Sequence, residues 1–352
     1  MVNRLVFGLT VVALAGCKSS SQTPGDGGPP DTANDRMVLP EVFIAGDSGG
    51  TADARDAADA PPACTGPKCP VVLATDDDPS CCLAVDGTYV YWVSFSGSAW
   101  SIMRVAGAGG TPEYFEGSEF IVGDLAIQGD ALYWTATDGV FRRDLAAARG
   151  SATKIASGSS NSSPIATDSN FAYWAGVGGT PVRKVPLAGG TSTDVATGVR
   201  AMAIASDGTN VYWSDRETQD GAFVMAPVAG GTPTVLATDL TNPGDVAVDG
   251  TSVYFADSST LFGTKIWKVP LGGGPPVMVA LAPDFGIYEI AVDATNVYWA
   301  AYRTIAKAPI GGGTITTIAT AQAGALYVAV DATNVYWLTT DIGAGAVMKL
   351  AK

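Results

Sequence analysis

A tyrosine followed by a second aromatic residue recurs through most of the chain. The pairs, in order, are Tyr91-Trp92, Tyr133-Trp134, Tyr173-Trp174, Tyr212-Trp213, Tyr254-Phe255, Tyr298-Trp299 and Tyr336-Trp337. Successive tyrosines are separated by 42, 40, 39, 42, 44 and 38 residues. The phrase VDATNVYW is repeated without change at 292–299 and 330–337. A period near 40 built from β-type segments predicts the blades of a β-propeller and not a helical solenoid.

Two other positions keep the same register as the tyrosine. Seven residues before it stands an alanine in every copy: Ala84, Ala126, Ala166, Ala205, Ala247, Ala291 and Ala329. Five residues before it stands Asp86, Gln128, Asp168, Asp207, Asp249, Asp293 or Asp331. A constant alanine suits an inner strand, where blades crowd around an axis. A recurring aspartate suits a tight turn, because its side chain hydrogen-bonds nearby backbone. We therefore interpret these aspartates as turn caps and not as a ring of metal ligands.

Each repeat divides into four strands, A to D, of the types LAVD, VYW, KVPL and TVLATD. Adjacent Tyr and Trp point to opposite faces of strand B, and both faces of a blade are covered by its neighbours. The last repeat ends after strand C, at 346–352, whereas VVLATDDDP at 71–79 resembles the strand D segment TVLATDLTNP at 234–243. We predict an all-β, seven-bladed propeller of four-stranded antiparallel blades over 71–352, closed by an N-terminal strand in the last blade. Six blades with a stray repeat are the alternative.

The aromatic pairs resemble the repeats of YWTD and NHL-type propellers, found in extracellular receptors and bacterial secreted proteins. The copies YWTAT at 133–137 and YWSD at 212–215 are the most similar. The resemblance covers the repeated region and concerns single repeats. Because YWTD propellers usually have six blades, it implies the fold class and not a particular family function.

The N-terminus has the pattern of an export signal. Arg4 precedes an apolar stretch from Leu5 to Gly16, which is too short to span a bilayer but suits a signal peptide. The residues Leu14-Ala15-Gly16-Cys17 resemble the lipobox of bacterial lipoproteins. This resemblance implies a signal peptide at 1–16, lipid on Cys17, and anchoring in the bacterial cell envelope, at the outer membrane on its periplasmic or cell-surface side. An ordinary secretory signal with a chance cysteine is the alternative.

Residues 17–63 are rich in Ser, Gly, Pro, Ala and Asp, with one apolar island at 37–46. Such a composition buries too little apolar surface to offset ordering, so we predict a disordered tether. The propeller domain is then 64–352, including a cysteine-rich segment at its start. In an exported protein, Cys64, Cys69, Cys81 and Cys82 predict two disulfides. Bridges from the first two cysteines to the last two, or a Cys64–Cys69 loop with a bonded 81–82 pair, are both compatible with the spacing.

The overall composition excludes several classes of function. A formal net charge of −14 and a pI near 4.3 disfavour nucleic acid and electrostatic docking on anionic lipid. The chain contains no histidine, so Ser-His-Asp catalysis and imidazole metal ligands are absent. No cofactor is expected, although calcium is possible, and no catalytic residue or metal ligand is assigned. Contact with the membrane is expected only through the N-terminal lipid.

Recognition in a propeller is expected on variable loops. The A–B and C–D turns are short and uniform, whereas the B–C and D–A loops at the opposite end of the blades are long and varied. On this second set we predict a binding face formed by Trp100, Phe120, Arg200, Arg216, Phe262, Tyr288, Tyr302 and Arg303. The predicted function is a monomeric binding or scaffold module for an unidentified protein or envelope ligand. The alternatives are a histidine-free, carboxylate- and calcium-dependent hydrolase of lactonase or glycosidase type, and a purely structural envelope protein.

Overall fold

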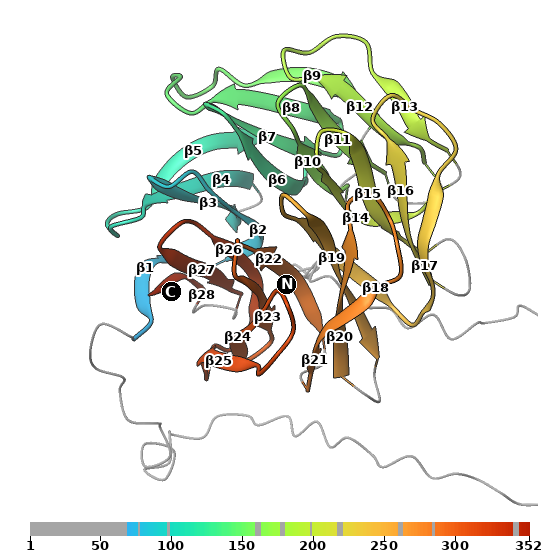
Figure 1. Ribbon diagram of the computed structural model, residues 1–352. Helices are drawn as coiled ribbons and strands as arrows, with labels where there is room; N and C mark the ends of the chain where they lie inside the picture. The colour runs from blue at the N-terminus through green and yellow to red at the C-terminus, as the bar shows by residue number, and fades with distance from the viewer. Residues whose placement is uncertain are drawn as a thin grey trace, which may run out of the picture. The chain divides into compact units, whose positions relative to one another are not determined.

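The computed structural model describes residues 69–76, 78–96, 99–158, 163–176, 180–197, 199–216, 221–259, 263–283, 286–340 and 345–352. Contacts divide the chain into units 1–63 and 64–352, and the described residues all belong to the second. The regular elements in the described residues are all β-strands. These residues contain no helix long and apolar enough to cross a membrane. Figure 1 shows these strands as seven sheets arranged around an axis.

Each sheet has one strand from each of four classes, which alternate in direction. The inner strands are β2 (Pro79–Val85), β6 (Val122–Gln128), β10 (Ile165–Thr167), β14 (Ala201–Ser206), β18 (Pro243–Val248), β22 (Ile287–Val292) and β26 (Ala325–Val330). The second strands are β3 (Tyr89–Ser96), β7 (Ala131–Ala136), β11 (Phe171–Ala175), β15 (Asn210–Asp215), β19 (Ser252–Ser259), β23 (Asn296–Ala301) and β27 (Asn334–Thr339). The third strands are β4 (Ala99–Ala106), β8 (Gly139–Asp144), β12 (Val182–Pro186), β16 (Gly221–Pro227), β20 (Gly263–Pro270), β24 (Thr304–Pro309) and β28 (Gly345–Ala351). The outer strands are β5 (Glu113–Ser118), β9 (Thr153–Ser157), β13 (Thr193–Ala196), β17 (Thr234–Leu240), β21 (Val277–Ala282), β25 (Thr316–Ala319) and β1 (Val71–Asp76).

The first outer strand in the chain belongs to the last blade. Sheet order is β1-β28-β27-β26, with Val71 opposite Lys349 and Ala74 opposite Val347. Neighbouring inner strands contact one another around the whole ring, including β2 with β26. The prediction of seven blades closed by an N-terminal strand is therefore confirmed, and the six-bladed alternative is wrong. Closure in this way ties both ends of the domain into one sheet.

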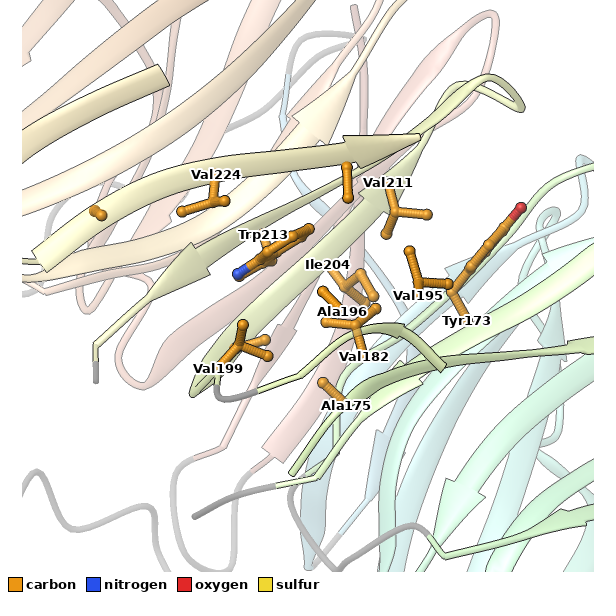
Figure 2. Packing of buried hydrophobic residues seen from close by; sticks show 13 residues of the cluster. Tyr173, Ala175, Val182, Val195, Ala196, Val199, Ile204, Val211, Trp213 and Val224 are labelled. Atoms are coloured by element: carbon orange, nitrogen blue, oxygen red, sulfur yellow. The ribbon is translucent and has the colours of Figure 1, made fainter. Parts of the chain in front are cut away.

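Seven apolar cores fill the spaces between blades, and each contains the Tyr of one blade with the Trp or Phe of the next. Figure 2 shows the core between blades 3 and 4, where Tyr173 and Val182 share a cluster with Val211 and Trp213. The alternation of a strand explains this pairing, since consecutive side chains point to opposite faces. The constant alanine is directly opposite the tyrosine in every blade, for example Ala84 opposite Tyr91. A larger side chain would compete there with the tyrosine ring.

The recurring aspartate caps the A–B turn as predicted. Asp331 Oδ1 accepts hydrogen bonds from the backbone N–H groups of Thr333 and Asn334, both at 2.7 Å. Its Oδ2 accepts one from the Tyr336 hydroxyl, also at 2.7 Å. Burial, followed by this hydrogen bond, raises the pKa of Tyr336 to about 12. The same Asp–Tyr contact occurs in six blades, and blade 2 has Gln128 in place of the aspartate.

A cation from strand C then joins neighbouring blades. Lys268 donates to the carbonyl of Ile310 at 3.3 Å, and Lys349 donates to that of Gly107 at 2.6 Å, which links the last blade to the first. The repeated Asp, Tyr and Lys or Arg are thus engaged in turns and blade contacts. Any recognition surface has to be sought among the residues that differ between blades.

Candidate functional site

The B–C and D–A loops lie at one end of the blades, and we call this end the loop face. Three of the ten most exposed large apolar side chains among the described residues are on it: Phe120, Tyr288 and Tyr302, with 40%, 38% and 54% of their surface exposed. The other seven are on outer strands, and most of these stand at the start of the strand, as Tyr114 and Val277 do. Of the four exposed aromatic side chains in this set, three are on the loop face and one, Tyr114, is on the outer strand β5.

The predicted binding residues are distributed unevenly over the loop face. Tyr302 and Arg303 form the exposed turn between β23 and β24. Trp100 is half-buried and packs on Phe95 with ring centroids 4.7 Å apart, so its ring belongs partly to the core of the first blade. Phe262 lies outside the described residues.

Arg200 and Arg216 are brought together by the ends of β14 and β15. The backbone N–H of Arg216 donates to the Arg200 carbonyl at 3.2 Å, and Asp215 Oδ1 accepts from the Arg200 N–H at 3.2 Å. The Arg216 Nε donates to the Pro243 carbonyl at 2.9 Å, so this side chain spans from blade 4 to blade 5. Burial, followed by the positive charge of Arg200, lowers the pKa of Arg216.

A second set of polar residues lies where the inner strands begin, near the loop face. Asp124, Asp245 and Glu289 each occupy the third position of their strand, two residues before the constant alanine. We call them the inner-strand carboxylates. Tyr327 has the same position in blade 7. The ring brings together residues that are far apart in the chain.

Each inner-strand carboxylate bonds the inner strand of the next blade. Asp124 Oδ2 accepts from the N–H of Ile165 at 3.1 Å, and Asp245 Oδ2 accepts from that of Ile290 at 2.8 Å. Glu289 Oε2 accepts from the N–H of Val328 at 2.9 Å. In every case the donor is the residue before the constant alanine. These side chains therefore connect blades 2 to 3, 5 to 6 and 6 to 7.

The electrostatic environment of these groups favours their protonated forms. Burial raises the pKa of Asp124 to about 6, against the opposing effect of its two backbone hydrogen bonds. Burial, with a smaller contribution from the Asp124 charge, raises the pKa of Asp245 to about 7. Burial and the charges of Asp245 and Asp124 hold the pKa of Glu289 well above its ordinary value. Burial and nearby negative charge also raise the pKa of Tyr327.

Water still has partial access to the inner-strand carboxylates, since each keeps an intermediate exposed fraction although protein atoms surround it closely. A carboxyl group of this kind can hold a proton near neutral pH, and it can then donate as well as accept hydrogen bonds. Within the described residues, no three acidic or thiol side chains converge closely enough to hold a metal ion.

Cys81 and Cys82 are bonded to each other on β2. The pairing in which both bridge back to Cys64 and Cys69 is therefore wrong for these two residues. Cys69 is also disulfide-bonded, and Cys64 lies outside the described residues, as does the predicted lipidation site Cys17. Register shifts on both sides of Cys81 and a φ of 64° at Cys82 explain the local pairing, because an irregular strand lets adjacent side chains meet.

Two hollows in the described residues are candidate binding sites. A hollow of about 370 Å³ at the A–B and C–D end is lined by Asp86, Tyr91 and Arg104, whose polar atoms are already engaged. A second, of about 350 Å³, lies between β17 and β20 at the rim. Neither coincides with the exposed aromatic residues or the arginine pair. We therefore base the candidate site on side-chain chemistry and not on concavity.

The sequence interpretation missed the inner-strand carboxylates as a group. Aligning the repeats on the constant alanine and comparing the residue two places earlier gives Cys82, Asp124, Pro164, Ala203, Asp245, Glu289 and Tyr327. Three acids at one structural position is a signal that could have been found. It is easily overlooked because the position is so variable.

No protein-family model matches the chain, and no curated protein matches it. Solved structures resemble it in fold. The WD40 domain of Neurospora crassa Pan2 is similar with a TM-score of 0.61 at 8% identity, over 82% of this chain and 98% of that one. BamB from Moraxella catarrhalis gives 0.50 at 14% identity, over 80% and 86%. A puromycin-hydrolysing peptidase of Mycobacterium tuberculosis gives 0.55 at 12%, over 76% of this chain and 51% of that one. At these identities the similarity shows a β-propeller and nothing about ligand or activity.

Proposed function

We propose that this propeller is a binding module that recognises a partner protein or envelope ligand through its loop face. One observation carries the proposal. The polar residues that recur from blade to blade are engaged in turns and blade contacts, whereas Phe120, Tyr288, Tyr302 and the arginine pair are not part of the repeat and lie on the loop face. Exposed aromatic and arginine side chains are enriched where proteins bind one another.

The proposal includes a location. The lipobox-like residues before Cys17 and the tether-like composition of 17–63 support a lipid-anchored module of the bacterial cell envelope, with its binding face presented to other envelope components. Replacing Cys17 with serine should release the protein from the membrane fraction. If the variant fractionates as the wild type does, the anchoring proposal is wrong.

The binding proposal is tested by affinity capture from envelope extracts. The test variant carries Tyr288→Ser and Tyr302→Ser on the loop face. The matched control carries Val277→Ser and Met278→Ser on β21, where the side chains are also exposed. A partner recovered with wild type and control, but reduced at least tenfold with the loop-face variant, supports the proposal. Equal recovery with all three proteins contradicts it.

A second candidate function, a carboxylate-dependent hydrolase of lactonase or glycosidase type with calcium as its metal, is favoured by the raised pKa values of Asp124 and Asp245. Carboxyl groups that hold a proton near neutral pH are suited to general acid catalysis. The test is hydrolysis of aryl glycosides and lactones, with and without calcium, by wild type and an Asp245→Asn, Glu289→Gln variant. Hydrolysis by the wild type that the variant lacks would support the hydrolase function. Equal hydrolysis rates for the two proteins would contradict it.

A further inference from the structure

Almost every basic side chain in the described residues is already engaged. Every described lysine places its ammonium group on a carboxylate, an aromatic ring or a backbone carbonyl. Four arginines form ion pairs, and Arg149 stacks on Tyr114 at 4.0 Å. The described arginines with neither an ion pair nor an aromatic ring contact are Arg200, Arg216 and Arg303, and all three lie on the loop face.

Arg200 and Arg216 differ from Arg303 because they are neighbours. The hydrogen bond between their backbones holds the two residues side by side. Burial and, as a smaller contribution, the charge of Arg200 lower the pKa of Arg216. In the described part of the chain, no carboxylate lies within ion-pairing distance of either guanidinium group. Two adjacent like charges with no ion-paired carboxylate among the described residues are stabilised when a ligand supplies a negative charge.

The Arg216 side chain is also held in place for such a ligand. Its Nε donates a hydrogen bond to the Pro243 carbonyl at 2.9 Å. Among the described residues, no acceptor is hydrogen-bonded to its two terminal nitrogens. A guanidinium anchored by Nε keeps a planar pair of donors that matches the two oxygens of a carboxylate. Arg200 is exposed beside it and adds a second donor group.

The rest of the molecule restricts the kind of anion. A formal net charge of −14 repels nucleic acid and anionic membranes over distances comparable to the Debye length, about 8–10 Å. A short-range contact with one carboxylate is compatible with that charge. We infer that Arg200 and Arg216 form a carboxylate-binding site on the loop face, and that the partner presents an acidic side chain or a free C-terminus to it. This inference rests on the proposed binding function.

The site can be tested directly on the full chain by labelling arginine with ¹⁵N and following each Nε–H resonance. The probes are a five-residue peptide with blocked ends and a central glutamate, the same peptide with glutamine, and the glutamine peptide with a free C-terminus. Saturable shifts of Arg200 and Arg216 with either carboxylate peptide, but not with the blocked glutamine peptide, are expected. The two carboxylate peptides distinguish an acidic side chain from a chain terminus.

Arg200→Gln and Arg216→Gln should each weaken that binding at least tenfold, and Arg216→Lys should weaken it less. Arg149→Gln, the matched control on an exposed arginine at the opposite end of the blades, should leave it unchanged. Thermal melting of each variant checks that it is folded. No saturable shift with either carboxylate peptide, equal shifts with the blocked glutamine peptide, or an equal effect of Arg149→Gln would overturn the inference. So would binding restricted to inorganic phosphate or to phosphatidylglycerol vesicles. If partner capture depends on Tyr288 and Tyr302 but not on Arg200 and Arg216, the carboxylate site fails while the binding function stands.

Discussion

The inner-strand carboxylates predict an unusual dependence of stability on pH. Their pKa values are raised on folding, so the folded protein retains protons that the unfolded chain has already released. The stabilisation is complete below the ordinary pKa of 3.8 and is lost as the pH rises through about 6 for Asp124 and about 7 for Asp245. The free energy of unfolding should therefore fall between pH 5 and pH 8.

The size of the effect follows from the same values. The pKa of Asp245 is about 3 above its ordinary value and that of Asp124 about 2 above, and each pKa unit corresponds to about 1.4 kcal/mol. For these two aspartates the upper limit is about 7 kcal/mol over the whole titration. Because water has partial access to both groups and part of the titration lies below pH 5, we expect about 3 kcal/mol between pH 5 and pH 8. For a domain of this size that is a fall of about 5 °C in Tm.

Urea unfolding at a series of pH values measures this directly. Asp245→Asn removes one titrating group, yet its amide oxygen can still accept from the Ile290 N–H, so the slope of stability against pH should decrease by about half. The matched control is Asp138→Asn, which removes an exposed carboxylate paired with Lys154. Constant or rising stability of the wild type from pH 5 to pH 8, or an unchanged slope in Asp245→Asn, would refute the reasoning.

Four further outcomes are expected. Leu73→Ala on the closing strand should cost about 3 kcal/mol in urea unfolding, because this side chain is 3% exposed, whereas Val72→Ala, 52% exposed on the same strand, should cost less than 0.5 kcal/mol. Tyr336→Phe should cost about 1 kcal/mol in the same assay, since it removes the hydroxyl that bonds Asp331. Burial raises the pKa of Asp331, but its turn hydrogen bonds outweigh burial and lower the pKa to about 2. The stabilisation by this carboxylate should therefore be present above pH 4 and be lost as the pH falls toward 2. Asp331→Asn should reduce the loss of stability between pH 4 and pH 2. Gly123→Ala should cost about 1–3 kcal/mol, because a methyl group there would be 2.8 Å from a threonine hydroxyl on β7.

The fold could be predicted because its information is periodic. The repeated alanine, aspartate and tyrosine make the same contacts in successive blades. A constant spacing in the sequence therefore corresponds to a constant arrangement of these residues in the ring. The closing strand was predictable for the same reason, since residues 71–79 repeat the spacing of an outer strand found elsewhere in the chain. The last repeat lacks a strand D, and a segment that resembles strand D precedes the first repeat. Together these two observations predicted that the N-terminal strand completes the last blade.

The candidate site was only partly predictable because its residues do not repeat. Arg200 and Arg216 were expected on the loop face, but their direct contact depends on the ends of two paired strands. Asp124 and Glu289 are separated by four blades, and their charges interact only once the ring has closed. The pairing of Cys81 with Cys82 depends on a backbone irregularity, which spacing alone does not reveal.

The central functional claim is that partners bind the loop face and not the rim. Its most direct test places a photo-crosslinking amino acid at Tyr302, at Tyr288 or at Val277 in the full-length protein within the cell envelope. We predict a discrete crosslinked product from the first two positions and none from Val277 on β21. A product from Val277 alone, with none from the loop face, would contradict the claim.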